Sequence, residues 1–147
     1  MLSAGLSVNG SELARGLQEV LPGRVVVTGG LAGDGQRFER TWVMHNGLPS
    51  DRRVVAVGFY GDAVRVAHGC EGGWLAFGPT RTITRSEGNV LYELDGEPAL
   101  PLYKRYLGEE SEGLPGTALV YPLSVRTGDD SVVRSVLSVD EETNALT

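Results

Sequence analysis

Apolar residues recur at helical spacing in two parts of the chain, and each recurrence predicts a helix. The first apolar stripe covers residues 10–22, where Ser11 is placed to cap the amino end. The second covers about residues 98–107, and Gly108 suits a left-handed carboxyl-terminal cap. Pro98 fits the first turn of this helix because its missing N–H costs little there. The sequence therefore predicts two helices.

Elsewhere, short runs of β-branched and alternating residues predict strands. They are expected at residues 24–28, 38–45, 53–60, 63–68, 80–86, 89–94, 117–125 and 132–139. Turns that contain glycine separate most of them. The turn that begins with Asn46-Gly47 is expected to run on to Asp51 as a longer hairpin loop.

The short connections between these strands favour an antiparallel sheet with the two helices packed on one face. The predicted fold class is therefore α+β, in a single compact unit over residues 1–147, a length typical of one domain. Apolar residues make up 41% of the chain, which is enough for a core. The 21 glycines show no collagen period, so they indicate turns and bulges.

The charge balance and the cysteine count narrow the function. Thirteen basic against nineteen acidic residues give a net charge of −6, which argues against nucleic-acid binding. Cys70 is the only cysteine, so no intrachain disulfide and no cysteine cluster for zinc can form, and a reducing compartment is expected. No apolar run approaches the ~20 residues that span a bilayer, and the amino end lacks the features of a signal peptide. We therefore expect a soluble cytoplasmic chain without nucleic-acid or membrane partners.

A glycine-rich loop, Gly29–Gly35, follows a predicted strand and invites comparison with phosphate-binding loops. It lacks the Lys and Ser/Thr of G-x-x-x-x-G-K-[ST], and the next predicted element is a strand rather than a helix. Two interpretations stay open, a tight turn and a loop that lines a ligand site. The sequence has no G-x-S-x-G motif and no recognisable Cys–His–Asp spacing, so no catalytic residue is assigned and no enzyme is expected.

His45 and His68 are the only histidines, and each belongs to a residue type that ligates metals and haem. His68 and Cys70 lie two residues apart and would share a face on a regular strand. The alternative interpretation is a partly exposed histidine beside a small buried cysteine. We therefore expect no metal and no cofactor, with haem as an alternative that requires one of these histidines.

Four stretches of the sequence together resemble one known family. They are Val27–Asp34 with Phe38 and Thr41; Val54–Phe59 with Gly69 and Gly72-Gly73-Trp74; Ile83–Leu100 with Tyr103; and Tyr121-Pro122-Leu123 with Val133-Arg134. The third stretch is the most specific, and the set covers about residues 25–140. In this order the stretches resemble the FIST sensory domain of prokaryotic signal-transduction proteins.

The resemblance implies a non-catalytic intracellular sensor that binds a small ligand, with amino acids as a suggested class; some proteins of this type bind haem. About residues 1–95 resemble the later part of the FIST N-terminal half, and about residues 96–147 resemble the start of its C-terminal half. We therefore expect a partial or truncated member of the family. Edges left exposed in this way favour self-association, so a homodimer is expected.

Eight residues are the candidate ligand contacts. They are Gly30, Ala32, Gly33, Asp34, Gly73, Trp74, Arg85 and Asn89. Asp34 suits a ligand ammonium and Arg85 a ligand carboxylate, whereas the alternatives are a turn-capping aspartate and a solvated strand arginine. Two other functions stay open. One is a protein-interaction or scaffold module, which needs only an exposed apolar patch or strand edge, and the other is a haem-binding gas sensor that uses His45 or His68.

Overall fold

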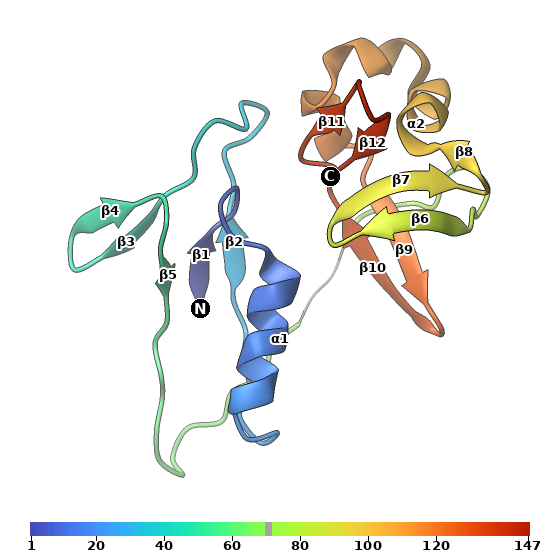
Figure 1. Ribbon diagram of the computed structural model, residues 1–147. Helices are drawn as coiled ribbons and strands as arrows, with labels where there is room; N and C mark the ends of the chain where they lie inside the picture. The colour runs from blue at the N-terminus through green and yellow to red at the C-terminus, as the bar shows by residue number, and fades with distance from the viewer. Residues whose placement is uncertain (70–71) are drawn as a thin grey trace. The chain divides into compact units, whose positions relative to one another are not determined.

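The computed structural model of the chain describes residues 1–69 and 72–147, which form two compact units (Figure 1). Unit 1 is Met1–Gly73 and unit 2 is Trp74–Thr147. The sequence predicts a single compact unit, whereas the contacts in the structure gather within each of the two. Each unit has one α-helix and antiparallel strand pairs, which confirms the α+β class. No helix in the described ranges has the length and hydropathy that crossing a membrane requires.

Unit 1 combines one helix with short strands. The elements are β1 (Leu2–Ala4), α1 (Gly10–Val20), β2 (Gly30–Ala32), β3 (Val43–His45), β4 (Leu48–Ser50) and β5 (Val54–Val55). A three-stranded sheet has the order β2-β1-β5, and β3 and β4 form a separate hairpin. β1 runs parallel to β2 and antiparallel to β5, so this sheet is mixed, whereas the other strand pairs of the described residues fit the expected, mainly antiparallel arrangement. The parallel pair arises because α1 lies in the connection between the two strands.

Helix α1 begins at Gly10, as predicted, but the residue that caps it differs from the one expected. Its N-cap is Asn9, whose side-chain oxygen accepts hydrogen bonds from the backbone N–H groups of Ser11 and Glu12 at 3.1 and 3.2 Å. The prediction of Ser11 as the cap is therefore wrong, because Asn9 satisfies the free amides of the first turn. The helix ends at Val20, and none of its residues is buried.

Most of the strands expected in unit 1 are shorter than predicted or form no ladder. The strand expected at 53–60 is reduced to β5, and the one at 38–45 is reduced to β3. Residues 24–28 and 63–68 form no strand in the described part of the chain. These segments have strand-forming composition, but a strand also needs a hydrogen-bonded neighbour, which the described residues do not supply.

The β3–β4 hairpin is tighter than expected. Asn46 and Gly47 have φ values of 50° and 79°, and His45 pairs directly with Leu48. Two consecutive positive φ angles are the requirement of a two-residue type I′ turn. The prediction of a longer loop that extends to Asp51 is therefore wrong.

Unit 2 contains a larger antiparallel sheet and a helix that covers it. The elements are β6 (Ile83–Glu87), β7 (Val90–Leu94), β8 (Glu97–Pro98), α2 (Ala99–Leu107), η1 (Gly108–Gly113), η2 (Gly116–Leu119), β9 (Leu123–Thr127), β10 (Asp130–Arg134), β11 (Val139–Asp140) and β12 (Ala145–Leu146). The sheet order is β11-β12-β7-β6 with β8 beside β7, and β9 and β10 form a two-stranded ribbon. The strand expected at 117–125 is wrong in its first half, which is the 3-10 turn η2.

Helix α2 supplies most of the core of unit 2. Leu100 and Leu102 are almost fully buried, and Tyr103 and Leu107 are 6% and 8% exposed. Leu100, Tyr103 and Leu107 form one core cluster with Ala99, Ala118, Val136 and Leu146. Gly108 follows α2 with a φ of 59°, so the prediction that this glycine ends the helix is confirmed. Because α1 and α2 belong to different units with separate sheets, the expectation of two helices on one sheet face is wrong.

Candidate functional site

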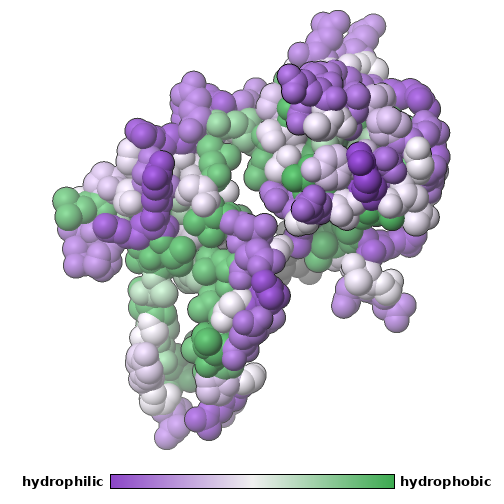
Figure 2. All heavy atoms as spheres, in the orientation of Figure 1, coloured by the Kyte–Doolittle hydropathy of each residue, from purple (hydrophilic) through white to green (hydrophobic). Residues whose placement is uncertain are grey.

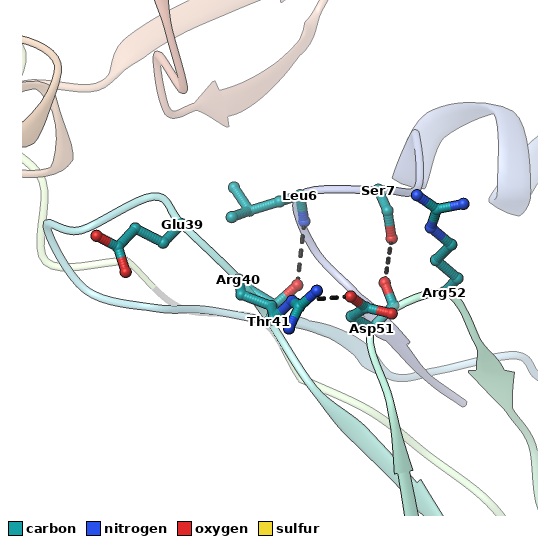
Figure 3. Close-up of a pocket in the computed structure, with 7 residues that line it drawn as sticks. All are labelled: Leu6, Ser7, Glu39, Arg40, Thr41, Asp51 and Arg52. Carbon is teal, nitrogen blue, oxygen red and sulfur yellow. Dashed lines mark hydrogen bonds and ion pairs between the residues drawn. The ribbon is translucent and has the colours of Figure 1, made fainter.

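Three segments of unit 1 surround a polar hollow of about 280 Å³ (Figure 3). One segment follows β1, the second precedes β3, and the third joins β4 to β5. The lining residues are Leu6, Ser7, Glu39, Arg40, Thr41, Asp51 and Arg52. A hollow that carries both cationic and anionic side chains suits a small polar ligand better than an apolar one.

Hydrogen bonds and one ion pair hold these segments together. The backbone N–H of Leu6 donates to Thr41 Oγ1 at 3.3 Å, and Ser7 Oγ donates to the carbonyl oxygen of Asp51 at 2.7 Å. Arg40 Nε lies 2.9 Å from Asp51 Oδ2. Thr41 is only 2% exposed, so the acceptor of the bond from Leu6 is buried. These bonds link residues that lie 35 and 44 positions apart in the sequence.

The two arginines of the hollow differ in their surroundings. Arg40 is held by Asp51 and also lies over the ring of Trp42, with its guanidinium carbon 5.0 Å from the ring centroid. The exposed guanidinium of Arg52 has no hydrogen bond or ion pair to any residue in the described ranges. Figure 3 shows Arg52 and Glu39 at opposite ends of the view. Arg52 is therefore the cation available to a ligand.

Asp34 shapes the segment that brings Arg40 and Thr41 to the hollow. Its Oδ1 accepts from Arg37 Nη2 at 2.5 Å, and its Oδ2 accepts from the backbone N–H groups of Glu39 and Arg40 at 3.1 and 3.2 Å. The Arg37 hydrogen bond, followed by the one from Arg40, lowers the pKa of the Asp34 carboxyl to about 2. The geometry corresponds to the turn-capping alternative, so Asp34 acts as a positioning residue of the loop.

The other candidate ligand contacts are distributed over both units, and none of the eight lines the hollow. Gly30 and Ala32 lie in β2, and Gly33 directly follows that strand. Gly73 is the last residue of unit 1. In unit 2, Trp74 is half-exposed, and Asn89 lies in the turn between β6 and β7. As ligand contacts these residues stay predictions.

Arg85, the predicted carboxylate partner, has neighbours within its own sheet. Its Nε lies 3.2 Å from Glu93 Oε1 across the β6–β7 pair. Its guanidinium carbon lies 4.6 Å from the ring centroid of Tyr92. Arg85 therefore fits the alternative interpretation, a strand arginine on the surface, better than the prediction that it binds a ligand carboxylate.

The histidines lie on exposed positions of unit 1. His45 ends β3 opposite Leu48, and His68 lies in a segment without strand pairing to the described residues. Cys70 lies outside the described residues. Within residues 1–69 and 72–147, no group of three or more His, Cys, Asp or Glu side chains is close enough together to hold a metal ion.

Sequence patterns did not reveal the hollow because its residues are isolated polar positions in loops. Leu6 and Ser7 reach Thr41 and Asp51 through the pairing of β1 with its neighbours. β1 is three residues long, which is too short for an alternating pattern to be recognised. The one available signal was Thr41, which belongs to the stretches of family resemblance.

Two models of known sequence families together match nearly the whole chain. A sequence model of the FIST N domain matches residues 1–97, and one of the FIST C domain matches residues 99–147. The chain belongs to the FIST family. FIST domains are sensory domains of signal transduction. No curated protein and no solved structure gives a significant match. In this FIST chain the two matches meet inside unit 2, where β7 of the first match pairs with β12 of the second.

Proposed function

We propose that the chain is a non-catalytic cytoplasmic sensory domain that binds a small zwitterionic ligand, of the amino-acid class, in the hollow of unit 1. Family membership supports the sensory role. The observation that carries the site is the Arg52 guanidinium, which lines the hollow without an ion-pair partner in the described part of the chain. This assignment moves the proposed carboxylate contact from Arg85 to Arg52.

The charges around the hollow favour a ligand with both signs of charge. Arg40 and Asp51 neutralise each other at 2.9 Å, which leaves Arg52 and Glu39 as the other charged lining residues. Arg52 suits a carboxylate, because a guanidinium offers two parallel N–H donors to its oxygens. No described residue donates a hydrogen bond to the carboxylate of Glu39, which suits an ammonium group.

A thermal-shift screen of the full chain against amino acids, common metabolites and haem tests this proposal. A ligand at about 100 times its dissociation constant adds roughly 2.7 kcal/mol to stability and raises the midpoint by several degrees. For a ligand found in this way, calorimetric titration compares the wild type with Arg52→Ala and with Arg53→Ala. Arg53 is the matched control, because it carries the same charge at the next position but does not line the hollow.

We expect Arg52→Ala to weaken binding about 10-fold or more, since hydrogen bonds to charged groups contribute roughly 1.5–3 kcal/mol. Arg53→Ala should leave the affinity unchanged. Equal losses in both variants would indicate a general effect of charge and would remove the hollow as the site. A Soret shift with haem that depends on His45 or His68 would favour the haem-sensor alternative.

The proposed assembly is a homodimer. β10 pairs with β9 on one edge only, within the described residues, and its Val132 and Val133 are each 43% exposed. An open strand edge with apolar side chains favours pairing with another chain. Light scattering at increasing protein concentration tests the assembly, and a constant monomer mass would contradict it.

A further inference from the structure

Four positions of the chain carry an asparagine or an aspartate directly before a glycine. They are Asn9, Asp34, Asn46 and Asp95. At such a pair the glycine nitrogen can attack the side-chain carbonyl carbon, because glycine has no side chain that hinders the approach. An asparagine amide is the better target, since a carboxylate is ionised at neutral pH and repels the attacking nitrogen. The sequence therefore marks Asn9 and Asn46 equally for this reaction, and the structure distinguishes them.

Hydrogen bonds hold three of the four side chains in place. Asn9 caps α1 and accepts from the backbone N–H groups of Ser11 and Glu12. Asp34 and Asp95 each accept from a nearby arginine and from at least one backbone N–H group. A side chain held in this way has to lose these bonds before its carbonyl carbon can turn towards the next residue's nitrogen. Each of the three is therefore protected by its own partners.

Asn46 differs from these three residues. Its side chain is exposed and forms no hydrogen bond to any residue in the described ranges 1–69 and 72–147. The N–H of Gly47 donates to no described residue either, because His45 and Leu48 are the residues that pair across the turn. Neither of the two reacting groups therefore has a bond to break.

The hairpin that carries Asn46 also opens readily at its tip. Among the described residues, β3 and β4 pair only with each other, over three residue pairs. Val43 anchors the base at 6% exposure, whereas Met44 and Leu48, nearer the tip, are 65% and 66% exposed. Figure 1 shows the hairpin projecting from unit 1, and Figure 2 shows both hydrophilic and hydrophobic residues on its surface. A short two-stranded pair opens at low free energy, which lets the backbone at Asn46 rotate into a reactive geometry.

We propose that Asn46 is a site of spontaneous deamidation, which converts it through a cyclic imide to aspartate and isoaspartate. The backbone nitrogen of Gly47 forms a bond to Asn46 Cγ, and the bond from Cγ to Nδ2 breaks. Nδ2 leaves as ammonia and takes the proton that the Gly47 nitrogen loses. Water then opens the imide at one of its two carbonyls, so the chain continues either through the main-chain carbonyl, as aspartate, or through Cγ, as isoaspartate. This inference goes beyond the small-ligand function and does not depend on it.

The two products have different effects on the hairpin. Aspartate keeps the length of the backbone and tolerates the φ of 50° at this position. Isoaspartate adds one methylene to the backbone, and a two-residue turn with His45 directly opposite Leu48 has no room for it. The extra group would therefore displace the β3–β4 pairing. Because Arg40 and Asp51 lie on the two legs beyond the base of this pairing, their ion pair would separate as well.

Incubation of the full chain at mildly alkaline pH, followed by tryptic digestion and mass spectrometry, tests the proposal. Trypsin places Asn46 in residues 41–52 and Asn9 in residues 1–15. Deamidation raises the mass of a peptide, and an isoaspartate methyltransferase with a labelled methyl donor detects the isoaspartate. In the folded chain we expect residues 41–52 to deamidate about 10-fold faster than residues 1–15, or more, because the cap bonds of Asn9 have to break first. In urea the two rates should be similar.

Asn46→Gly is the matched control, because a Gly-Gly turn allows both positive φ angles and has no side-chain amide. It should keep the amide exchange of the hairpin and show no mass gain in residues 41–52. In the isoaspartate fraction, exchange in β3 and β4 should be several-fold faster than in the unmodified chain, whereas Asn46→Asp should leave it unchanged.

Two results would overturn the site. One is equal deamidation of Asn46 and Asn9 in the folded chain. The other is methyl label in residues 25–37 or 86–104, which contain Asp34 and Asp95, ahead of residues 41–52. Unchanged exchange of β3 and β4 in the isoaspartate fraction would overturn the effect on the hairpin.

Discussion

The interactions that stabilise unit 1 internally differ from those that stabilise unit 2. Unit 1 buries four residues in its described part, Ser3, Ala4, Thr41 and Val43, and two of them are polar. Unit 2 buries nine apolar residues, most of them on α2 or packed against it. Hydrophobic burial is the larger stabilising effect, and each net hydrogen bond contributes only about 1 kcal/mol. Unit 1 therefore has only a small core of its own, whereas unit 2 has the larger apolar core.

The largest effect should come from a truncation in the core of unit 2. Leu100 is 0% exposed, and Leu100→Ala should lower the free energy of unfolding by about 2–5 kcal/mol through lost contacts and a cavity. Val57→Ala in unit 1, where the side chain is 72% exposed, should change it by less than about 0.5 kcal/mol. Urea unfolding followed by circular dichroism measures both. Comparable losses would mean that Val57 is buried in solution and would end the contrast between the units.

A buried hydroxyl in unit 2 should produce the next largest effect. Tyr103 Oη donates to the carbonyl oxygen of Tyr121 at 2.7 Å, and burial raises the pKa of Tyr103 to about 12. Tyr103→Phe should cost about 1 kcal/mol, because it removes one hydrogen bond and retains the ring. Tyr60→Phe is the control, since Tyr60 is 93% exposed.

The raised pKa gives this prediction a pH dependence. The stabilising contribution of neutral Tyr103 is fully present below the unfolded pKa of about 10 and is lost as pH rises towards 12. The difference in unfolding free energy between the wild type and Tyr103→Phe should therefore shrink at alkaline pH. A difference that stays constant from pH 8 to pH 11.5 would show that Tyr103 is not the group responsible.

In unit 1, loss of a polar interaction should affect only the residues near it. Asp34→Asn removes the charged acceptor of Arg37 and weakens the bonds from the Glu39 and Arg40 amides. We expect several-fold faster exchange of those two amides and no change in the exchange of α2, because unit 1 opens separately from the core of unit 2. Asp62→Asn in an exposed turn is the matched control. Faster exchange in α2 would show that the two units unfold together.

Acid should have the same local effect as this substitution. The pKa of Asp34 is lowered to about 2, so its contribution is present above the unfolded pKa of about 3.9 and is lost as pH falls through 2. The chemical shift of the Asp34 carboxyl carbon reports this directly. A titration midpoint near 4 would mean that the bonds from Arg37 and Arg40 do not form in solution.

The comparison also shows what the sequence could predict. Helix α2 and the β6–β7 pair lie within one to three residues of their predicted bounds, because their turns and caps are encoded locally, as at Gly108. In unit 1 the sheet depends on β1, a strand of three residues that pairs with β2 across a long connection. Alternation in so short a segment carries no signal, so β1 was missed. The hollow, whose residues meet through β1, was missed for the same reason.

The smallest effects on stability should distinguish Arg52 from Arg85 as the residue that binds the ligand carboxylate. Arg85 pairs with Glu93 on the surface of unit 2, with 58% of its side chain exposed, so Arg85→Gln should cost less than about 1 kcal/mol. Arg52 has no ion pair in the described part of unit 1, so Arg52→Gln should leave the unfolding free energy unchanged. Affinity for a ligand found in the thermal-shift screen should respond in the opposite order, falling for Arg52→Gln and not for Arg85→Gln. A loss of affinity in Arg85→Gln alone would return the carboxylate contact to β6 and would leave the hollow of unit 1 without its role.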